Sequence, residues 1–547
     1  MFLLIVSLIS FQYFSPIEAA SDLEITTNIT ISGTSKEYNK IIIRNGGKLY
    51  INSPEIMITA NYLQIDTGGE VTYHSNQNKN PMTIIFNIHG NAVINGHINL
   101  QGISGTNGAY SGGSGYNGGN GGSGQPGKKI IFNVENKFSL GSIINTLGGA
   151  GGKGGNGHDD DHIFKDPIGD GGNGGSGGEG GIININANEI LINSSGQLIT
   201  TGGSGGNGGN GGDGGWVGKG GRGGTGGNGG QGGKITLMVE TGSFRNMGEI
   251  RTNGGTRGEK GSGRGGASDG SNGSPGVAGV IDITSLYFQN TGIMTSTGKT
   301  NNQSLIKIGY GNNSGTITPA PKWLRDELAP TPDGSFIIDF ISEGKTNDSD
   351  NVFYTNDTSP ILRWTTFTDL EYSREGHFIP ASGFKHYEIR LLRDKQRIDI
   401  DGGSNLLNIM LNNEIELKRG FPDSPAQELQ DGKYELQVLA SDMADNYSNG
   451  YPSPAFRLTI DTVPPTSPIL KSESNVSTDQ VTVNWEPSSD DNQIIDCYEL
   501  QIYEEVPKGG LAPLTETKII NGSISSYSLH GLSEINSSEK ITIKPNQ

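Results

Sequence analysis

The sequence has 547 residues, of which 89 are glycine and 32% are hydrophobic. Its formal net charge of −18 at pH 7 argues against nucleic acid and anionic membrane surfaces as partners, because both are bound through basic patches. So much glycine without matching proline is typical of low-complexity sequence or of a repeat architecture, and the length is sufficient for three or four domains.

The first twenty residues, MFLLIVSLISFQYFSPIEAA, are an apolar segment that ends in small residues. This pattern predicts a signal peptide over residues 1–20 with cleavage near Ala20. The segment has no Lys or Arg, so a buried first strand is the alternative. No later apolar run reaches the length of a transmembrane helix, and we therefore expect a secreted or cell-surface chain without membrane insertion. Cys497 is the only cysteine, which excludes an intrachain disulfide and favours a bacterial extracellular protein.

A unit of about fifty residues recurs along the glycine-rich part of the chain. Each copy has an alternating strand, a break, a second short strand, a turn and a third strand. The copies cover residues 82–102, 127–149, 180–203, 232–255 and 278–298. The alternation of apolar and polar residues indicates strands that are buried on one side.

Equivalent positions in these copies carry similar residues, as expected for parallel strands that stack on one another. One ladder consists of Ile98, Ile144, Leu198, Ile250 and Ile293, and the next consists of Leu100, Thr146, Thr200, Thr252 and Thr295. The predicted fold class is all-β, with a right-handed parallel β-helix, or β-solenoid, over residues 21–315.

Long Gly-Gly-X runs lie between the third strand of one copy and the first strand of the next. The run GGSGGNGGNGGDGGWVGKGGRGGTGGNGGQGG covers residues 202–233. Collagen is excluded, because the runs contain almost no proline. The strict period of three favours a layer of polyglycine II-like helices joined by backbone hydrogen bonds, with a disordered linker as the alternative. This part of the chain resembles the glycine-rich surface proteins of bacteria and the polyglycine tips of some phage fibres.

A connector that carries several prolines is predicted over residues 316–345, followed by longer strands with fewer glycines over 346–465. Trp364 lies in one of these strands, and the stretch 429–434 reads LQDGKY. These residues resemble a fibronectin type III or bacterial immunoglobulin-like domain, and the resemblance implies a β-sandwich with a core Trp and a tyrosine corner. Residues 466–547 look like a second copy with Trp485 in the core. This copy lacks the corner and a clear last strand, so we expect it to be incomplete and the chain to be a truncated form of a longer protein.

Two groups of acids are candidate metal ligands. Asp159 and Asp161 belong to the cluster HDDDH, and Asp442, Asp445 and Asp461 lie near the junction of the two predicted sandwiches. Carboxylate oxygens suit calcium, which would be the only cofactor. Solvated loops and turns without metal are the alternative for both groups.

The predicted binding surface is the threonine ladder Thr146, Thr200, Thr252 and Thr295 together with Trp216, whose ring can stack on sugars. Internal stacking of the threonines within the solenoid is the alternative. These features favour a non-enzymatic extracellular or cell-surface protein for adhesion, with carbohydrate or protein surfaces as partners. A polysaccharide-active β-helix enzyme is the alternative, but it needs acids or bases that converge across neighbouring coils, and the repeated strand positions carry none.

Overall fold

The structure is a computed structural model of the chain. It describes residues 21–74, 82–110, 116–159, 168–214, 219–300, 302–341, 345–347, 352–374, 376–398, 409–410, 412–421, 424–471, 475–476, 480–490, 495, 497–506, 510–513, 518–530 and 539–546. All regular elements within these ranges are β-strands, in agreement with the predicted all-β class. Within them, no helix of sufficient length and apolarity to cross a bilayer occurs. The predicted signal peptide lies outside the described residues.

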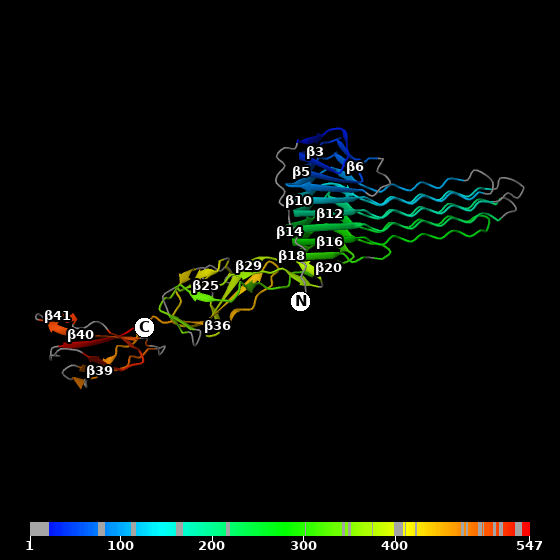
Figure 1. Cartoon of the computed structure of the whole chain (residues 1–547). Coiled ribbons are helices and arrows are strands. Elements are labelled where there is room, and N and C mark those ends of the chain that lie inside the picture. Colours follow the sequence, from blue (N-terminus) through cyan, green and yellow to red (C-terminus); the bar gives the residue numbers. More distant parts are fainter. Residues whose placement is uncertain are drawn as a thin grey trace, which may run out of the picture. The chain divides into compact units, whose positions relative to one another are not determined.

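The described residues between 21 and 330 fold mainly into two parallel sheets that run side by side in one body (Figure 1). Sheet A contains the longer strands. Its members are β1 (Leu23–Ile25), β3 (Ser35–Ile43), β5 (Glu55–Ile65), β7 (Thr83–Ile88), β8 (Ala92–Ile94), β10 (Lys129–Leu140), β12 (Ile182–Ile192), β14 (Lys234–Asn246), β16 (Val280–Asn290), β18 (Leu305–Asn313) and β20 (Lys322–Arg325).

Sheet B contains the shorter strands. Its members are β2 (Asn28–Ile31), β4 (Lys48–Ile51), β6 (Glu70–Tyr73), β9 (His97–Asn99), β11 (Ile143–Asn145), β13 (Gln197–Ile199), β15 (Glu249–Arg251), β17 (Ile293–Thr295) and β19 (Thr316–Thr318). The chain alternates between the two sheets, so each sequence repeat adds a strand to sheet A and then a strand to sheet B. Equivalent residues pair directly: Lys129 lies opposite Ile182, and Ile182 lies opposite Lys234.

The core of this body is the space between the two sheets. Inward-facing Ile, Leu, Val and Phe side chains from every coil form one continuous buried cluster. Like residues stack on like residues: the rings of Phe86 and Phe132 are 5.2 Å apart and those of Phe244 and Phe288 are 5.4 Å apart. Burial of such large side chains is the main favourable contribution to folding, because each removes a large apolar area from water.

The last coils depart from the prediction in two ways. Sheet register places Met294, and not Ile293, on the ladder above Ile250, and Ile293 is 47% exposed. Stacking of the turn residue Gly292 on Gly248 fixes this register, because a slip of one residue would turn each side chain to the other face.

In addition, β19 and β20 continue both sheets past residue 315, since the prolines of this stretch fall between these strands and not within them. The predicted connector 316–345 thus contains strands.

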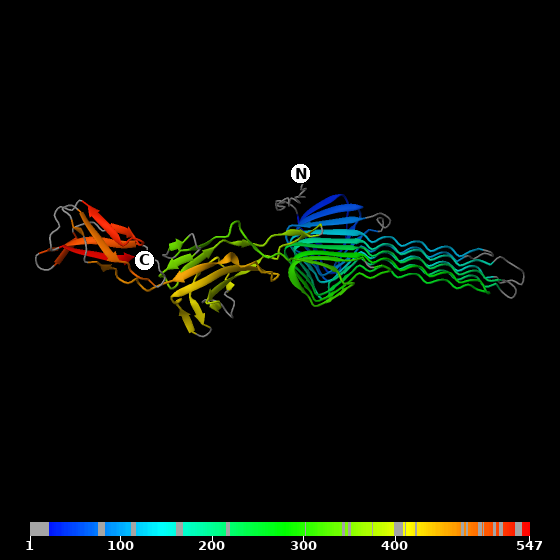
Figure 2. The same ribbon diagram turned by 90° about the horizontal axis from the view of Figure 1, so that it is seen from below.

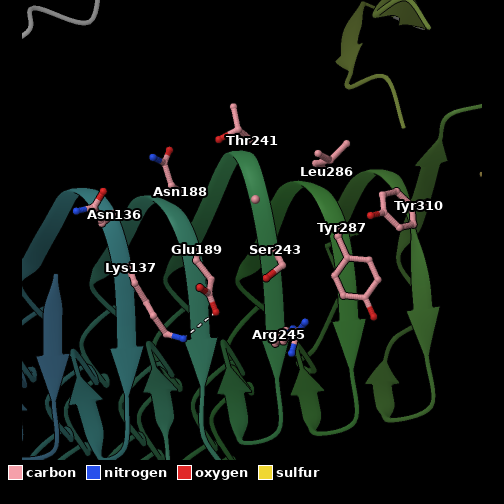
Figure 3. A pocket seen from close by; sticks show the side chains of 11 residues that line it. Asn136, Lys137, Asn188, Glu189, Thr241, Ser243, Arg245, Leu286, Tyr287 and Tyr310 are labelled. Carbon is pink, nitrogen blue, oxygen red and sulfur yellow. Dashed lines mark hydrogen bonds and ion pairs between the residues drawn. The ribbon is translucent and has the colours of Figure 1, made fainter. Parts of the chain in front are cut away.

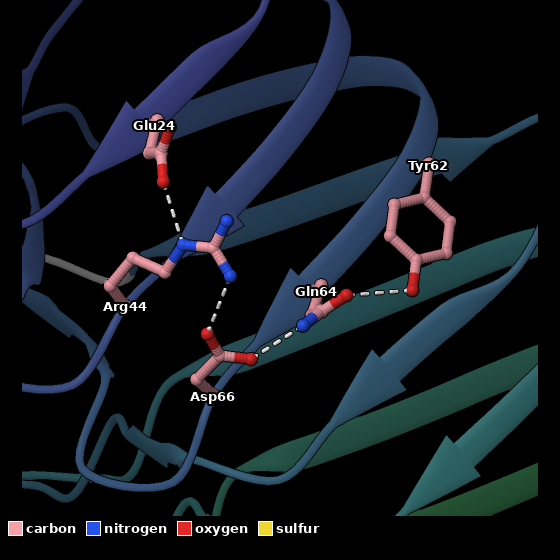
Figure 4. Close-up of polar contacts among 5 residues, drawn as sticks. All are labelled: Glu24, Arg44, Tyr62, Gln64 and Asp66. Atoms are coloured by element: carbon pink, nitrogen blue, oxygen red, sulfur yellow. Dashed lines mark hydrogen bonds and ion pairs between the residues drawn. The ribbon is translucent and has the colours of Figure 1, made fainter.

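The first coils carry a polar network on their outer surface (Figure 4). Arg44 Nε lies 2.7 Å from a carboxylate oxygen of Glu24, and Arg44 Nη1 lies 3.1 Å from Asp66 Oδ2. Gln64 donates to Asp66, and Tyr62 donates to Gln64. The Gln64 hydrogen bond and the Arg44 guanidinium lower the pKa of Asp66. The network links three successive coils, but its exposure limits its contribution to stability.

The described parts of the Gly-Gly-X runs leave the body on one side and lie alongside one another as extended chains (Figures 1 and 2). In each triplet, both glycine N–H groups donate to a neighbouring run. Gly174 donates to the carbonyl of Thr225 in the next insert, and Gly175 donates to the carbonyl of Gly152, both at 2.8 Å. The backbone groups of these runs are therefore hydrogen-bonded as regularly as those of a sheet.

Glycine is required at these positions by the closeness of the neighbouring backbones. A Cβ atom on Gly206 would lie 1.9 Å from the carbonyl oxygen of Gly152, far inside van der Waals contact. The X positions point outward, and several of them are asparagines. The side chain of Asn173 accepts a hydrogen bond from the backbone N–H of Thr225 at 2.9 Å, and Asn207 accepts one from Glu259 at 3.0 Å. Asparagine thus accepts a hydrogen bond from the backbone N–H of an X residue in a neighbouring run, a group that the glycine contacts do not use.

A second unit comprises residues 331–368, 385–441 and 447–547, and it contains two sandwiches. In the first, Trp364 from one sheet meets Tyr387 from the other, with ring centroids 5.3 Å apart. Tyr434 donates to the carbonyl of Gln430, which is the hydrogen bond of a tyrosine corner. The strands of this sandwich are β21 (Thr331–Pro332), β22 (Ile338–Phe340), β23 (Lys345–Asn347), β24 (Val352–Thr355), β25 (Ile361–Trp364), β26 (Phe367–Thr368), β29 (Phe384–Arg393), β30 (Gln396–Ile398), β31 (Ile409–Met410), β32 (Glu414–Glu416), β33 (Arg419–Phe421), β34 (Ser424–Gln427), β35 (Gly432–Asp442) and β36 (Tyr451–Ile460).

In the second sandwich, Trp485 and Tyr498 come from different sheets and their rings lie 5.4 Å apart in a small buried core. Its strands are β37 (Ile469–Leu470), β38 (Asn475–Val476), β39 (Gln480–Glu486), β40 (Cys497–Val506), β41 (Gly510–Pro513), β42 (Lys518–Asn521), β43 (Ser526–His530) and β44 (Glu539–Asn546). The expectation that a last strand is missing is wrong, because β44 pairs with β40 from Cys497 to Glu504. Pro545 within the strand and a serine-rich approach obscured it in the sequence.

Candidate functional site

The threonine ladder does not form a surface. Thr146, Thr200 and Thr252 are fully buried between the sheets, and Ser296 continues their column in place of Thr295. The prediction of a contact surface here is therefore wrong, because the third strand of each coil turns this position inward. Trp216, the other predicted contact residue, lies outside the described residues.

The acids of the HDDDH cluster are described only in part. Asp159 is exposed, and its carboxylate accepts a hydrogen bond from the backbone N–H of Asp213 at 2.7 Å. It thus plays the same part as the asparagines at the other X positions. Asp161 lies outside the described residues.

Three carboxylates that are far apart in sequence meet in the first unit. Oxygens of Asp326, Asp369 and Asp442 all lie within 4.8 Å of one another. These residues belong to the end of the parallel-sheet body and to two loops that pack with it, 369–384 and 442–446. The first loop contains the hairpin of β27 (Tyr372–Arg374) and β28 (His377–Ile379). Asp326 is 3% exposed and Asp442 is completely buried.

Backbone donors hold this carboxylate cluster in place. Asp326 accepts from the N–H of Ser382 at 2.7 Å, and Asp442 accepts from the N–H groups of Ala444 and Asn446. Asp369 Oδ2 accepts from the N–H of Gly383 at 2.6 Å. The other oxygen of Asp369 is buried and finds no donor among the described residues. No ion pair within the described part of the chain involves any of the three acids.

Burial and mutual repulsion make the ionised state of this cluster costly. Burial, and then the negative charges of Asp326 and Asp442, raise the pKa of Asp369 to about 6. Burial is also the main cause that raises the pKa of Asp442. A bound proton or cation would therefore stabilise the cluster.

The cluster suits a hard divalent cation such as Ca²⁺, since its donors are all oxygens and one of them lacks any other partner. Asp442 was singled out from the sequence, but Asp445 and Asp461 are not members of the group. Asp445 adopts a left-handed conformation at φ 64°, and Asp461 accepts from the N–H of Val463. Both therefore act in turns. Asp326 and Asp369 were not predicted, because no local pattern connects them with Asp442.

A groove of about 600 Å³ crosses the outer side of sheet A where its long strands bend (Figure 3). Five strands contribute, from β10 to β18. Asn136, Asn188 and Thr241 stand at the crest of successive bends, and below them lie the ion pair of Lys137 with Glu189 and the rings of Tyr287 and Tyr310.

Strand irregularities shape the groove. Two residues of β10, Glu135 and Asn136, lie opposite the single residue Asn188 of β12, and the register shifts again between β12 and β14 and between β14 and β16. Such bulges bend the strand and redirect side chains. The lining residues fall in the breaks of the repeats, where the copies differ in length, so the ladder alignment did not reveal them. Their signal in the sequence is the gathering of Lys, Glu, Arg and Tyr at these breaks.

Comparisons with known proteins give no family for the chain. No family model matches it, and no curated protein matches it. Among solved structures, the FN1–FN3 domains of chicken CNTN1 match with 14% identity and a TM-score of 0.18, over 37% of this chain and 60% of that one. The central fibronectin-III array of RIM-binding protein matches with 8% identity and a TM-score of 0.13, over 40% of this chain and 63% of that one. The chain thus spans less than two thirds of either structure, and TM-scores this low establish no common fold.

Proposed function

We propose that the chain is a non-enzymatic extracellular or cell-surface protein with a structural and adhesive role. In this proposal the stacked parallel sheets are a right-handed β-solenoid, the Gly-Gly-X runs are a polyglycine II layer, and the two sandwiches are fibronectin type III-like spacers. Export is by the signal peptide expected over residues 1–20.

The observation that carries the proposal is the hydrogen-bonded glycine layer. Ordering so much glycine costs more backbone entropy than ordering any other sequence. Regular bonds such as those of Gly174 and Gly175 offset this cost and give a stiff projection, and most of the described X side chains on it are exposed. A stiff array in which Asn, Ser and Thr side chains recur suits contact with another surface.

The test is adhesion of the full chain to surfaces coated with polysaccharides or with matrix proteins, next to an assay for released reducing ends on the same polysaccharides. We expect retention on at least one coating without release. Absence of retention on every coating would contradict the proposal.

The alternative is a polysaccharide-active enzyme, and the groove on sheet A is the observation in its favour. Glycoside hydrolysis uses a pair of carboxylates. Among the described residues that line the groove, Glu189 is the single carboxylate, and it is paired with Lys137 at 2.8 Å. Binding is therefore the better interpretation of this groove, and measurable release of reducing ends or of unsaturated products would reverse the choice.

A further inference from the structure

We infer that the groove on sheet A is a binding site for an extended, carboxylate-bearing glycan. The inference rests on the proposed adhesive function and names its ligand class. The lining residues supply the three kinds of contact that such a ligand needs: an aromatic platform, an uncompensated cation and a row of neutral polar groups.

The platform consists of Tyr287 and Tyr310. These residues are directly opposite in the register of β16 and β18, and their half-buried rings have centroids 5.2 Å apart. Aromatic rings that are half covered by protein present one apolar face at little cost in side-chain entropy, and the C–H face of a sugar ring packs on such a surface. Tyrosine adds a hydroxyl group for the sugar's own hydroxyls.

The cation is Arg245. Its guanidinium lies 5.7 Å from the centroid of the Tyr287 ring, so the cation and the platform form one continuous surface. Arg245 is exposed and makes no ion pair with a described residue, whereas the neighbouring Lys137 is neutralised by Glu189. A guanidinium binds a carboxylate through two parallel hydrogen bonds, which favours a uronate residue over a neutral sugar next to the tyrosines.

The net charge of the chain does not oppose such a ligand. Residues 21–330 contain 22 Lys and Arg and 22 Asp and Glu, so the excess of negative charge lies almost entirely after residue 330. The stretch that carries the groove is therefore neutral overall, and the charged residues that line the groove are Lys137 and Arg245 against Glu189, an excess of one positive charge.

The length of the groove favours a chain over a single sugar. Neighbouring strands are about 4.8 Å apart, so five strands span about 19 Å. Asn136, Asn188 and Thr241 repeat along this direction with the period of the coils, and each offers hydrogen bonds to ring hydroxyls. A glycan that runs along the stack would meet a polar crest residue in each of these three coils, then Leu286 in the next one.

The experiment is a calorimetric titration of the full chain with three uronate tetramers (galacturonate, mannuronate and a hyaluronan tetrasaccharide) and with cellotetraose as the neutral probe. We expect at least one uronate to bind more tightly than cellotetraose, with an affinity that falls as salt is added. Arg245→Gln should weaken the uronate about tenfold and cellotetraose little. Tyr287→Ala combined with Tyr310→Ala should weaken both probes at least tenfold.

Matched controls are Arg257→Gln and Tyr110→Ala, which change exposed residues of the same types outside the groove. Arg245 is exposed, so its variant keeps the test valid if the double tyrosine variant unfolds. Failure of all three uronates to bind, or equal binding by Arg245→Gln and the parent, would overturn the inference. If the parent chain adheres to coated surfaces and the groove variants adhere equally well, the groove inference fails while the adhesive function stands.

Discussion

At the scale of single residues, the structure is governed by what happens to buried polar groups. A buried hydroxyl or carboxylate is costly unless it has a partner. The backbone N–H groups of Gly174 and Gly175 in the Gly-Gly-X runs have one, whereas the hydroxyls of Thr200 and Thr252 and one oxygen of Asp369 have none among the described residues. These atoms are where substitution or a bound ion should change stability most.

The stability of the first unit should depend on pH through Asp369. Its pKa in the folded state is about 6, above the value of an unfolded aspartate, so the folded state binds more protons between these two values. Without divalent cations the free energy of unfolding should therefore fall as pH rises from 4 to 7, by about 1–3 kcal/mol. Chemical denaturation in EDTA measures this slope, and Asp369→Asn should flatten it. A slope of opposite sign would contradict the assignment.

Calcium should offset the loss of stability that the ionised carboxylates cause at neutral pH. At pH 7, millimolar Ca²⁺ is expected to raise the melting temperature of the parent chain by several degrees, because a ligand that binds only the folded state stabilises it. Asp369→Asn and Asp442→Asn should lose most of this gain, whereas Asp445→Asn should keep it. Equal shifts in all four chains would mean that calcium acts elsewhere.

Substitution of a buried threonine should stabilise the protein. Thr252→Val removes a buried hydroxyl without a partner and retains the shape of the side chain, so the free energy of unfolding should rise by about 1 kcal/mol. Thr146→Val is the control, because Thr146 donates to the carbonyl of Ile199 at 3.3 Å and its removal should give less gain or a loss. Thermal denaturation of both variants separates the two cases.

At the scale of elements, backbone packing in the glycine layer and side-chain packing between the sheets follow different rules. Between the sheets, side-chain volume fills the space, as the stacked Phe86 and Phe132 show. In the Gly-Gly-X runs, the absence of glycine side chains allows neighbouring backbones to come into contact. We therefore expect substitutions to be tolerated at the X positions and not at the glycines.

Gly206→Ala should disrupt the layer locally, because its Cβ would lie 1.9 Å from the carbonyl oxygen of Gly152. We expect faster hydrogen exchange of the amides in 147–158 and 168–181 and a loss of about 2–4 kcal/mol in local stability. Ser204→Ala, two residues away on the exposed edge, should leave exchange unchanged. Equal protection in both variants would show that the close contacts do not stabilise the runs.

At the scale of the whole molecule, charge is divided unevenly along the chain, with a neutral stretch up to residue 330 and an acidic remainder. Neither part has the excess of basic residues that phosphate backbones require. We expect no retention by double-stranded DNA or by phosphatidylserine vesicles at physiological salt, as measured by gel shift and sedimentation. Binding to either would show that local basic patches outweigh the net charge.

The sequence by itself determined the features that depend on local periodicity. Alternation along the strands predicted which side chains are buried, and the period of three in the glycine runs predicted outward-facing X residues, because both follow from the geometry of an extended backbone. Tertiary structure alone decided which distant residues meet. The register of Met294 depends on a glycine turn stacked one coil away, the carboxylates of Asp326, Asp369 and Asp442 converge through loop paths, and bulges in neighbouring strands bring Arg245 beside Tyr287. No local pattern carries such information, because these contacts depend on the paths of chain segments that are far apart in sequence.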